Sequence, residues 1–335
     1  PVGFVRWTAQ RNFEAVLDMM AKGVLNVKPL ISHRFKVDDA KRAYDVLLSD
    51  KKSLGILLEY DSESSLPIIG RTITTSFVSD RSPGKAIVSF VGAGNYAAST
   101  LIPAFKATAA TLRTVASAGG VSAWHVSKKF GFEKASTDVE EVLRDKETTV
   151  IVIATRHDSH ASLVLEGLKK GKHVFVEKPL CIKEDELEKI IETYSSLSSA
   201  QSTPPILMVG FNRRFSPLII KTKELLTRLT GEKAVIITVN AGHVPSDHWV
   251  HDQTIGGGRI IGEACHFVDL LRYLVDAKFS RWERFDMKCF NKDTATLQFS
   301  FEDGSIGTVH YLANGNRGFP KERIEVFVAG AILQI

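Results

Sequence analysis

Two apolar patterns follow one another along the chain. Within residues 1–60, apolar positions recur every three or four residues over 12–22 and again over 38–48, which predicts two amphipathic helices. Short apolar runs at 27–33 and 54–60 predict two strands. We therefore expect a small α/β appendage at the start of the chain.

From residue 86 onward, short apolar runs rich in β-branched residues alternate with helical patterns. This alternation is typical of a parallel sheet whose strands are joined by crossover helices. It predicts an α/β domain of the Rossmann type, with a doubly wound parallel sheet, over residues 85–205. The predicted strands are 86–91, 112–117, 149–154, 173–176 and 206–209.

The stretch before this domain, residues 61–84, is rich in Ser, Thr and Pro, which indicates a linker. Within it, 68–77 is compatible with one short strand. The chain begins at Pro1 and ends at Ile335 in an apolar run, so we expect a fragment of a longer protein.

Apolar runs in the last third of the chain alternate like antiparallel strands, and Asp303-Gly304 is a hairpin signal between two of them. We predict that residues 206–335 form an α+β domain for substrate binding and oligomerisation. Its sheet would be largely antiparallel and incomplete at the C-terminus. The predicted strands are 234–240, 295–301 and 305–312.

Composition and charge narrow the classes of partner. The formal net charge is +5, from 43 basic and 38 acidic residues, and the basic residues form no block typical of a nucleic-acid arm. Cys181, Cys265 and Cys289 are far apart, which indicates neither a disulfide framework nor a zinc site and favours the reducing cytoplasm. No apolar run approaches the length of a membrane span. We expect a cytoplasmic protein that binds a small ligand, with no nucleic-acid or membrane partner.

A glycine loop, Gly92-Ala-Gly-Asn-Tyr-Ala97, lies between the first strand of the Rossmann pattern and the next helix. Gly92 permits the tight turn, Gly94 lets the backbone approach a pyrophosphate, and Ala97 permits close packing of helix on sheet. The N–H groups at the start of the helix would meet the phosphates. The loop therefore predicts dinucleotide binding through Gly92, Gly94, Asn95, Tyr96 and Ala97.

The next strand ends at Ser117 and lacks the acidic residue that usually holds the adenosine ribose. Ser117 is able to hydrogen-bond either a ribose hydroxyl or a 2′-phosphate, and no arginine follows closely. Both NAD and NADP remain open as the cofactor.

Several motifs occur in one order and together resemble the Gfo/Idh/MocA family of oxidoreductases, which includes glucose–fructose oxidoreductase and inositol dehydrogenase. The likeness covers about residues 85–330 and implies NAD(P)-dependent hydride transfer at a sugar carbon. The motifs are the glycine loop, Ala154-Thr-Arg-His-Asp-Ser-His160, Gly171-Lys-His-Val-Phe-Val-Glu-Lys-Pro179, Gly210-Phe-Asn-Arg-Arg-Phe215 and Gly256-Gly-Gly…His266.

The resemblance implies two catalytic side chains. Lys178 would hydrogen-bond the reacting hydroxyl, and its peptide with Pro179 is often cis in such enzymes. His266 would act as acid and base, for which an ordinary pKa of about 6.5 is suitable. Relatives carry an aspartate one turn before this histidine, but that position is Gly262, so we expect Glu263 to orient the imidazole. The alternatives are a solvated lysine and a capped core histidine.

The resemblance also implies cofactor contacts after the third and fourth strands of the sheet. The loop with Thr155, His157 and His160 would lie along the nicotinamide ribose, although Asp158 or Ser159 also suits a helix cap. Glu177 would bond that ribose or hold its own loop.

Sugar contacts are expected from two further segments. Arg213 suits hydroxyls, a carboxylate or a diphosphate, although a surface ion pair is an equal alternative. In residues 242–252, rich in His, Trp and Asp, we expect Trp249 against a sugar face with His248 and Asp252 on hydroxyls. The irregular spacing does not favour a metal.

The first 60 residues are similar to the C-terminal end of zinc-type medium-chain alcohol dehydrogenases. The similarity rests on Gly23-Val-Leu-Asn-Val-Lys-Pro-Leu-Ile-Ser-His33 and Asp39-Ala-Lys-Arg-Ala-Tyr44. It implies a bi-domain oxidoreductase of which only the tail of the first unit is present. Because these helices lack their usual partners, we expect them to pack on the second unit or on another copy.

Together these features predict an NAD(P)-dependent oxidoreductase that acts on a sugar or nucleotide sugar, for example in polysaccharide synthesis. We expect a homo-oligomer formed through the second-domain sheet. One alternative is an NAD-dependent glycosidase or lyase that oxidises its substrate transiently, with no net redox change. Another is a non-catalytic, dinucleotide-binding regulatory protein.

Overall fold

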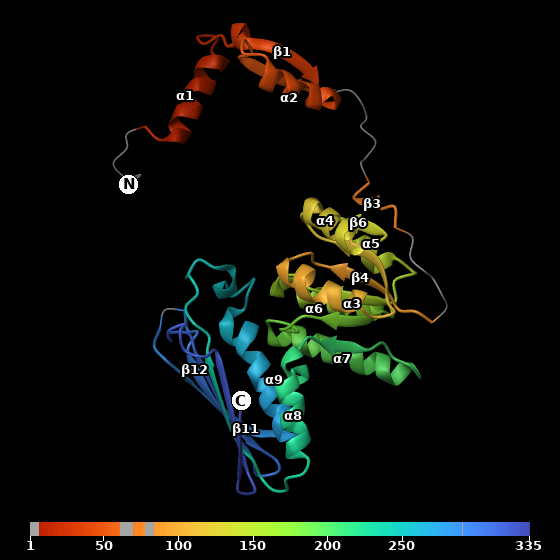
Figure 1. Ribbon diagram of the computed structural model, residues 1–335, viewed down its shortest axis with the longest axis vertical. Helices are drawn as coiled ribbons and strands as arrows, with labels where there is room; N and C mark the ends of the chain where they lie inside the picture. Colours follow the sequence, from red (N-terminus) through yellow and green to blue (C-terminus); the bar gives the residue numbers. More distant parts are fainter. Residues whose placement is uncertain (1–6, 61–69, 78–83, 290) are drawn as a thin grey trace. The chain divides into compact units, whose positions relative to one another are not determined.

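The computed structural model describes residues 7–60, 70–77, 84–289 and 291–335 (Figure 1). The chain divides into two compact units, Pro1–Gly70 and Arg71–Ile335. Among the described residues, no helix has both the length and the apolar character needed to cross a bilayer.

The first unit contains the elements that its apolar pattern predicts. Its helices are α1 (Ala9–Ala21) and α2 (Ala40–Ser49), and its strands, β1 (Ile31–Lys36) and β2 (Gly55–Glu59), form a parallel pair. Helix α1 begins after Thr8, whose Oγ1 accepts a hydrogen bond from the backbone N–H of Arg11. No residue of α1 is buried, and in α2 only Ala43 is.

The second unit starts with a seven-stranded sheet of order β3-β6-β5-β4-β7-β8-β9. Every neighbouring pair is parallel except β3 with β6. This confirms the Rossmann-type sheet. The strands are β3 (Thr72–Thr74), β4 (Ile87–Val91), β5 (Thr111–Ala116), β6 (Lys134–Ser136), β7 (Val150–Ile153), β8 (His173–Val176) and β9 (Leu207–Val209).

Successive residues of a strand point to opposite faces of the sheet, so these buried strands present apolar side chains on both faces. Helices cover both faces. On β4, Phe90 belongs to one core cluster and Val91 to the other. Helices α3 (Ile102–Lys106) and α4 (Gly120–Phe130) contribute to the first cluster or border it. The other face carries α5 (Val139–Arg144), α6 (His160–Lys169) and α7 (Glu184–Ala200).

Two predicted boundaries need correction. Strand β3 lies inside the stretch predicted as a linker, and it confirms the short strand expected there. Strand β9 pairs with β8 and belongs to the Rossmann sheet, so this domain extends past residue 205.

The second domain is a six-stranded sheet of order β11-β12-β13-β10-β14-β15. It is largely antiparallel as predicted, but β10 and β13 pair in parallel. Strands β11, β14 and β15 have no counterpart in the prediction. The strands are β10 (Ala234–Asn240), β11 (Phe279–Asp286), β12 (Ala295–Phe301), β13 (Ile306–Leu312), β14 (Glu322–Val328) and β15 (Ala331–Gln334).

Helices α8 (Pro217–Leu226) and α9 (Cys265–Val275) contribute to a core shared with this sheet, beside which Figure 1 shows them. Six residues of α9 are buried, among them Leu271. A Cβ on Gly307 of β13 would lie 2.5 Å from Cδ1 of Leu271, so the glycine is what allows this close approach. A π-helical turn, Ile260–Ala264, precedes α9 and leads into the candidate site.

Candidate active site

The glycine loop lies at the C-terminal end of β4 and leaves room for a phosphate group. Gly92 has φ +108°, and a Cβ there would lie 2.3 Å from the carbonyl oxygen of Ala154, so no larger residue fits. Gly94 faces open space, with no atom within 4 Å of its Cβ position. Ala97 is buried against the sheet. The loop therefore has the form that a pyrophosphate needs.

A cleft of about 1210 Å³ runs along this loop and past the ends of β5 and β7. Ser117 and Thr155 line it, as predicted for residues that contact a cofactor. Glu140 of α5 also lines the cleft and was not predicted, because it lies on a helix and not at the end of β5, where the carboxylate that holds the ribose usually stands. The size and lining of the cleft fit a dinucleotide.

A second pocket, of about 580 Å³, adjoins this cleft and shares Gly94, Asn95, Thr155 and Trp249 with it. Lys178 lines the pocket from the loop after β8, and the Lys178–Pro179 peptide is cis, as expected. Its Nζ donates a hydrogen bond to the carbonyl oxygen of Gly262 at 2.9 Å. The lysine thus lies between the two domains.

His266 lines the same pocket from the first turn of α9. Burial, with a further contribution from the charge of Lys178, lowers the pKa of His266 to about 3. The expectation of an ordinary pKa is therefore wrong, and the ring is neutral at physiological pH. Its Nδ1 is buried and has no hydrogen-bond partner among the described residues.

Glu263 does not orient this imidazole, which corrects the prediction. Its carboxylate accepts hydrogen bonds from Tyr311 and, at 3.0 Å, from Arg259, and Nζ of Lys321 lies 3.4 Å away. Burial would raise the pKa of Glu263, but these hydrogen bonds and charges outweigh it and hold the pKa below its ordinary value. Glu263 is an ionised wall of the pocket.

His157 fills the space that a side chain at position 262 would need. A Cβ on Gly262 would lie 2.8 Å from Cε1 of His157, so an aspartate there would displace the ring. Nδ1 of His157 lies 2.8 Å from the carbonyl oxygen of Gly256. Burial lowers the pKa of His157 to about 4.

His160 takes a structural position, contrary to the prediction that it contacts the cofactor. It is fully buried, and its ring nitrogens lie 2.7 Å from the carbonyl oxygen of Pro179 and 3.2 Å from that of Thr155. It lines neither the cleft nor the pocket. Its role is to tie together the loops that carry Thr155 and Lys178.

Two further cofactor candidates line the pocket. Glu177 is buried, its Oε1 has no partner among the described residues, and burial raises the pKa of its carboxyl group. The hydroxyl of Tyr96 accepts a hydrogen bond from Nδ2 of Asn212 at 3.0 Å. The orphaned oxygen of Glu177 points to a missing donor such as a ribose hydroxyl.

Comparison with known proteins identifies the domain that carries this cleft. The model of an oxidoreductase family with an NAD-binding Rossmann fold, Gfo/Idh/MocA, matches residues 87–203. Residues 87–203 thus match the NAD-binding Rossmann domain of this family.

Relatives of known activity match the chain over slightly more than half its length. Myo-inositol 2-dehydrogenase of Thermotoga maritima is 26% identical over 210 residues, which are 60% of this chain and 60% of that protein. Scyllo-inositol 2-dehydrogenase (NAD(+)) of Bacillus subtilis is 28% identical over 195 residues, 55% of this chain and 54% of that protein. The matches thus span less than two thirds of either relative.

Solved structures share the fold beyond the matched domain. The levoglucosan dehydrogenase complex with NADH superposes with a TM-score of 0.66 at 20% identity, covering 75% of this chain and 72% of that one. The likeness shows that the fold of the Rossmann domain together with the second domain is shared with that structure.

Arg213 lines the second pocket and is already paired. Its guanidinium donates to the carboxylate of Glu322 and lies 4.5 Å from the ring centroid of Phe267. This fixes its position at the pocket wall, and the ion pair expected as an alternative is present.

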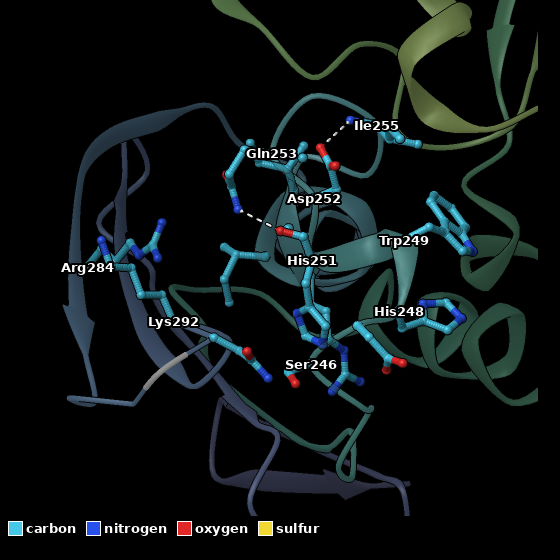
Figure 2. A pocket seen from close by; sticks show the side chains of 16 residues that line it. Ser246, His248, Trp249, His251, Asp252, Gln253, Ile255, Arg284 and Lys292 are labelled. Carbon is cyan, nitrogen blue, oxygen red and sulfur yellow. Dashed lines mark hydrogen bonds between the residues drawn. The ribbon is translucent and has the colours of Figure 1, made fainter. Parts of the chain in front are cut away.

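The loop with Trp249 borders the cleft, the pocket and an outer pocket of about 890 Å³ (Figure 2). His248 lines the outer pocket and the second pocket, and its Nδ1 accepts from the N–H of Val250 at 3.3 Å. Oδ1 of Asp252 accepts from Thr254 and Ile255 and shapes the loop. Asp252 lines the outer pocket with Trp249 and His248 but not the second pocket, and its contact with a sugar hydroxyl stays a prediction.

Proposed function

We propose that the chain is part of an NAD(P)-dependent oxidoreductase that transfers hydride between a nicotinamide cofactor and a carbon of a sugar or sugar-like polyol. One observation carries this proposal. Lys178 and two neutral imidazoles line one pocket, and this pocket shares Gly94 and Asn95 with the dinucleotide cleft. A hydroxyl placed there is beside a cation, a proton acceptor and the cofactor site at once.

The residues of the pocket supply complementary functions. A bound nicotinamide would accept the hydride. The ammonium group of Lys178 donates to the reacting oxygen and stabilises the negative charge that develops as its proton leaves. A neutral imidazole takes that proton; the family resemblance assigns this role to His266. Trp249 offers an apolar ring to the face of the substrate that carries C–H groups.

Relatives that act on cyclic, polyhydroxylated compounds support this substrate class. The proteins matched include inositol and levoglucosan dehydrogenases. Nucleotide sugars and a place in polysaccharide synthesis stay predictions from the sequence. So do a homo-oligomer through the second-domain sheet and the alcohol-dehydrogenase origin of residues 1–60.

The decisive experiment has two stages. Binding of NAD(H) and NADP(H) is measured by calorimetry, and inositols, sugars and nucleotide sugars are then screened by the absorbance of reduced nicotinamide. We expect at least one dinucleotide to bind and at least one polyol to reduce it. Absence of binding would contradict the proposal. A released sugar without net cofactor reduction would instead favour transient oxidation, and binding without any turnover would favour a regulatory protein.

The role of Lys178 is tested by Lys178→Ala. We expect kcat to fall at least about 100-fold, because a donor to developing charge is lost, while the Kd for the dinucleotide changes less than about threefold. Lys189→Ala serves as the control, because Lys189 lies on α7, away from the pocket, and is paired with Asp185 at 3.0 Å. An equal loss of cofactor binding and turnover would show that Lys178 holds the cofactor.

A further inference from the structure

The second pocket, which we propose as the catalytic pocket, contains two imidazoles that are held in different ways. His157 comes from the loop after β7 of the Rossmann domain, and His266 comes from α9 of the second domain. Both are largely buried, and both line the pocket with Lys178. The contacts of each ring decide which of them is prepared to take a proton.

The tautomer of His157 is fixed by the second domain. The carbonyl oxygen of Gly256 has no proton to give, so Nδ1 of His157 must carry one and donate it across the 2.8 Å contact. In the neutral ring, Nε2 then holds the free electron pair. Nε2 makes no hydrogen bond to any described residue, and it is available to a substrate.

The acceptor of this bond is itself held in place. The N–H of Gly256 donates to the carbonyl oxygen of Asp252 at 2.8 Å, and the N–H of Asp158 donates to that of Ile255 at 3.1 Å. These hydrogen bonds fix the backbone segment that faces His157. A proton gained at Nε2 would strengthen the Nδ1–H bond to Gly256, because the donor becomes charged.

His266 has no such support. Nδ1 of its ring is buried without a partner among the described residues, so neither tautomer is selected. The carboxylate three residues before it, that of Glu263, is engaged by Tyr311 and Arg259 instead. Positive charge on this ring would face Lys178 and Arg213 with no acceptor on its inner side.

We propose that His157, through Nε2, accepts the hydroxyl proton in the reaction proposed above, and that His266 binds a substrate hydroxyl. The inference rests on that proposed function. As the substrate C–H bond breaks, its electron pair would leave as hydride to a bound oxidised nicotinamide. The hydroxyl group on the same carbon would lose its proton to Nε2, and a carbonyl group would form. In the reverse direction, Nε2 returns the proton.

Charged groups near His157 shape its titration. Burial has the largest effect on its pKa, the bond to Gly256 opposes it, His160 and Lys178 lower the pKa further, and Asp158 raises it. The pKa of about 4 keeps the ring neutral near pH 7. If this base limits the rate, the acid limb of kcat/KM lies well below the ordinary histidine range of about 6.5.

Two substitutions separate the nitrogens of His157. His157→Asn keeps an N–H where Nδ1 stands and removes Nε2, whereas His157→Gln keeps a polar atom nearer Nε2. We expect His157→Asn to lower kcat at least about 100-fold while the Kd for the dinucleotide changes less than about threefold. His266→Asn is expected to raise KM more than it lowers kcat. His125→Asn, at an exposed position of α4, is the control.

Different results would contradict the inference and the proposed function. If the unmodified chain turns over a polyol and His157→Asn retains its kcat, or if His266→Asn loses more of kcat, the inference is wrong. If the unmodified chain binds no dinucleotide, the proposed function has failed instead. Rescue of His157→Ala by added imidazole would support the missing base.

A measurement on the free protein checks the geometry without turnover. Long-range proton–nitrogen correlation spectra of the histidine rings report which nitrogen is protonated, and His157→Asn assigns the signal. We expect His157 to be neutral near pH 7, with its proton on Nδ1 and none on Nε2. A proton on Nε2, or a charged ring at that pH, would overturn the inference even if all variants fold.

Discussion

Helices α1 and α9 are both amphipathic, yet they differ completely in what covers them. Helix α9, of 11 residues, has six buried residues, five of them in the core shared with the second-domain sheet, whereas α1, of 13 residues, has none. Periodicity records which face of a helix is apolar, but the partner that covers this face is encoded elsewhere in the chain. The described residues 7–60 form regular elements around almost no core, whereas 71–335 contains three buried clusters.

Leu271→Ala is expected to lower the free energy of unfolding more than any other substitution in this comparison of the two units. The side chain is 0% exposed and packs over Gly307, so the substitution removes buried apolar atoms and leaves a cavity. We expect the free energy of unfolding of the second unit to fall by about 4 kcal/mol. Urea denaturation measures it. A loss below about 1 kcal/mol would mean that the core repacks around the cavity.

Arg113→Met and its control compare the ion pairs of the two units. We expect Arg113→Met to lower the free energy of unfolding by about 3 kcal/mol. The guanidinium, with 11% of its side chain exposed, is paired with Glu133, Asp145 and Glu147. Arg34→Met is the control, because the Arg34–Glu59 pair of the first unit is half exposed and contributes less than about 1 kcal/mol.

The effect of Arg113→Met also has a defined pH dependence. Burial would raise the pKa of Asp145, but its hydrogen bonds, first that from Arg113, outweigh burial and hold the pKa below 3.8. A depressed pKa contributes stability above the unfolded value, which is lost as pH falls through the folded value. The difference between the two proteins should therefore be largest near neutral pH and shrink below about pH 4. A constant difference would exclude the carboxylates as its origin.

Leu17→Ala on α1 is expected to have the smallest effect. This side chain is 63% exposed, so its truncation should change the free energy of unfolding by less than about 0.5 kcal/mol. It is the direct match of Leu271→Ala, and both are followed by the same denaturation. A loss above about 2 kcal/mol would show that another surface covers α1, as the sequence predicts.

Long apolar runs made most of the Rossmann sheet predictable. Buried strands such as β7 are apolar without interruption, and helices of regular period separate them. Strands β6 and β11 were not predicted, because their local composition is not typical of strands. Lys134–Ser136 is only three residues long, and β11 is largely exposed with four charged residues. Such strands exist because a neighbour offers hydrogen bonds, which a local pattern does not record.

The candidate site divides in the same way. The glycine loop and Lys178 were predicted because each stands at the end of a recognisable strand. The engagement of Glu263 by Tyr311, 48 residues away, was not, and neither was the contact of His157 with Gly256 across 99 residues. Helix geometry placed Glu263 on the right face, but competition from a better-placed phenol and guanidinium decided its partner.

The contacts that Lys178 and His157 make across the domains end on carbonyl oxygens, those of Gly262 and Gly256. Every amino acid carries the same carbonyl group, so no point substitution deletes either acceptor. What mutation is able to change is the path of the chain, which depends on Gly257 and Gly258 in the left-handed region. These two contacts between the domains are therefore robust to changes of side-chain chemistry at positions 256 and 262.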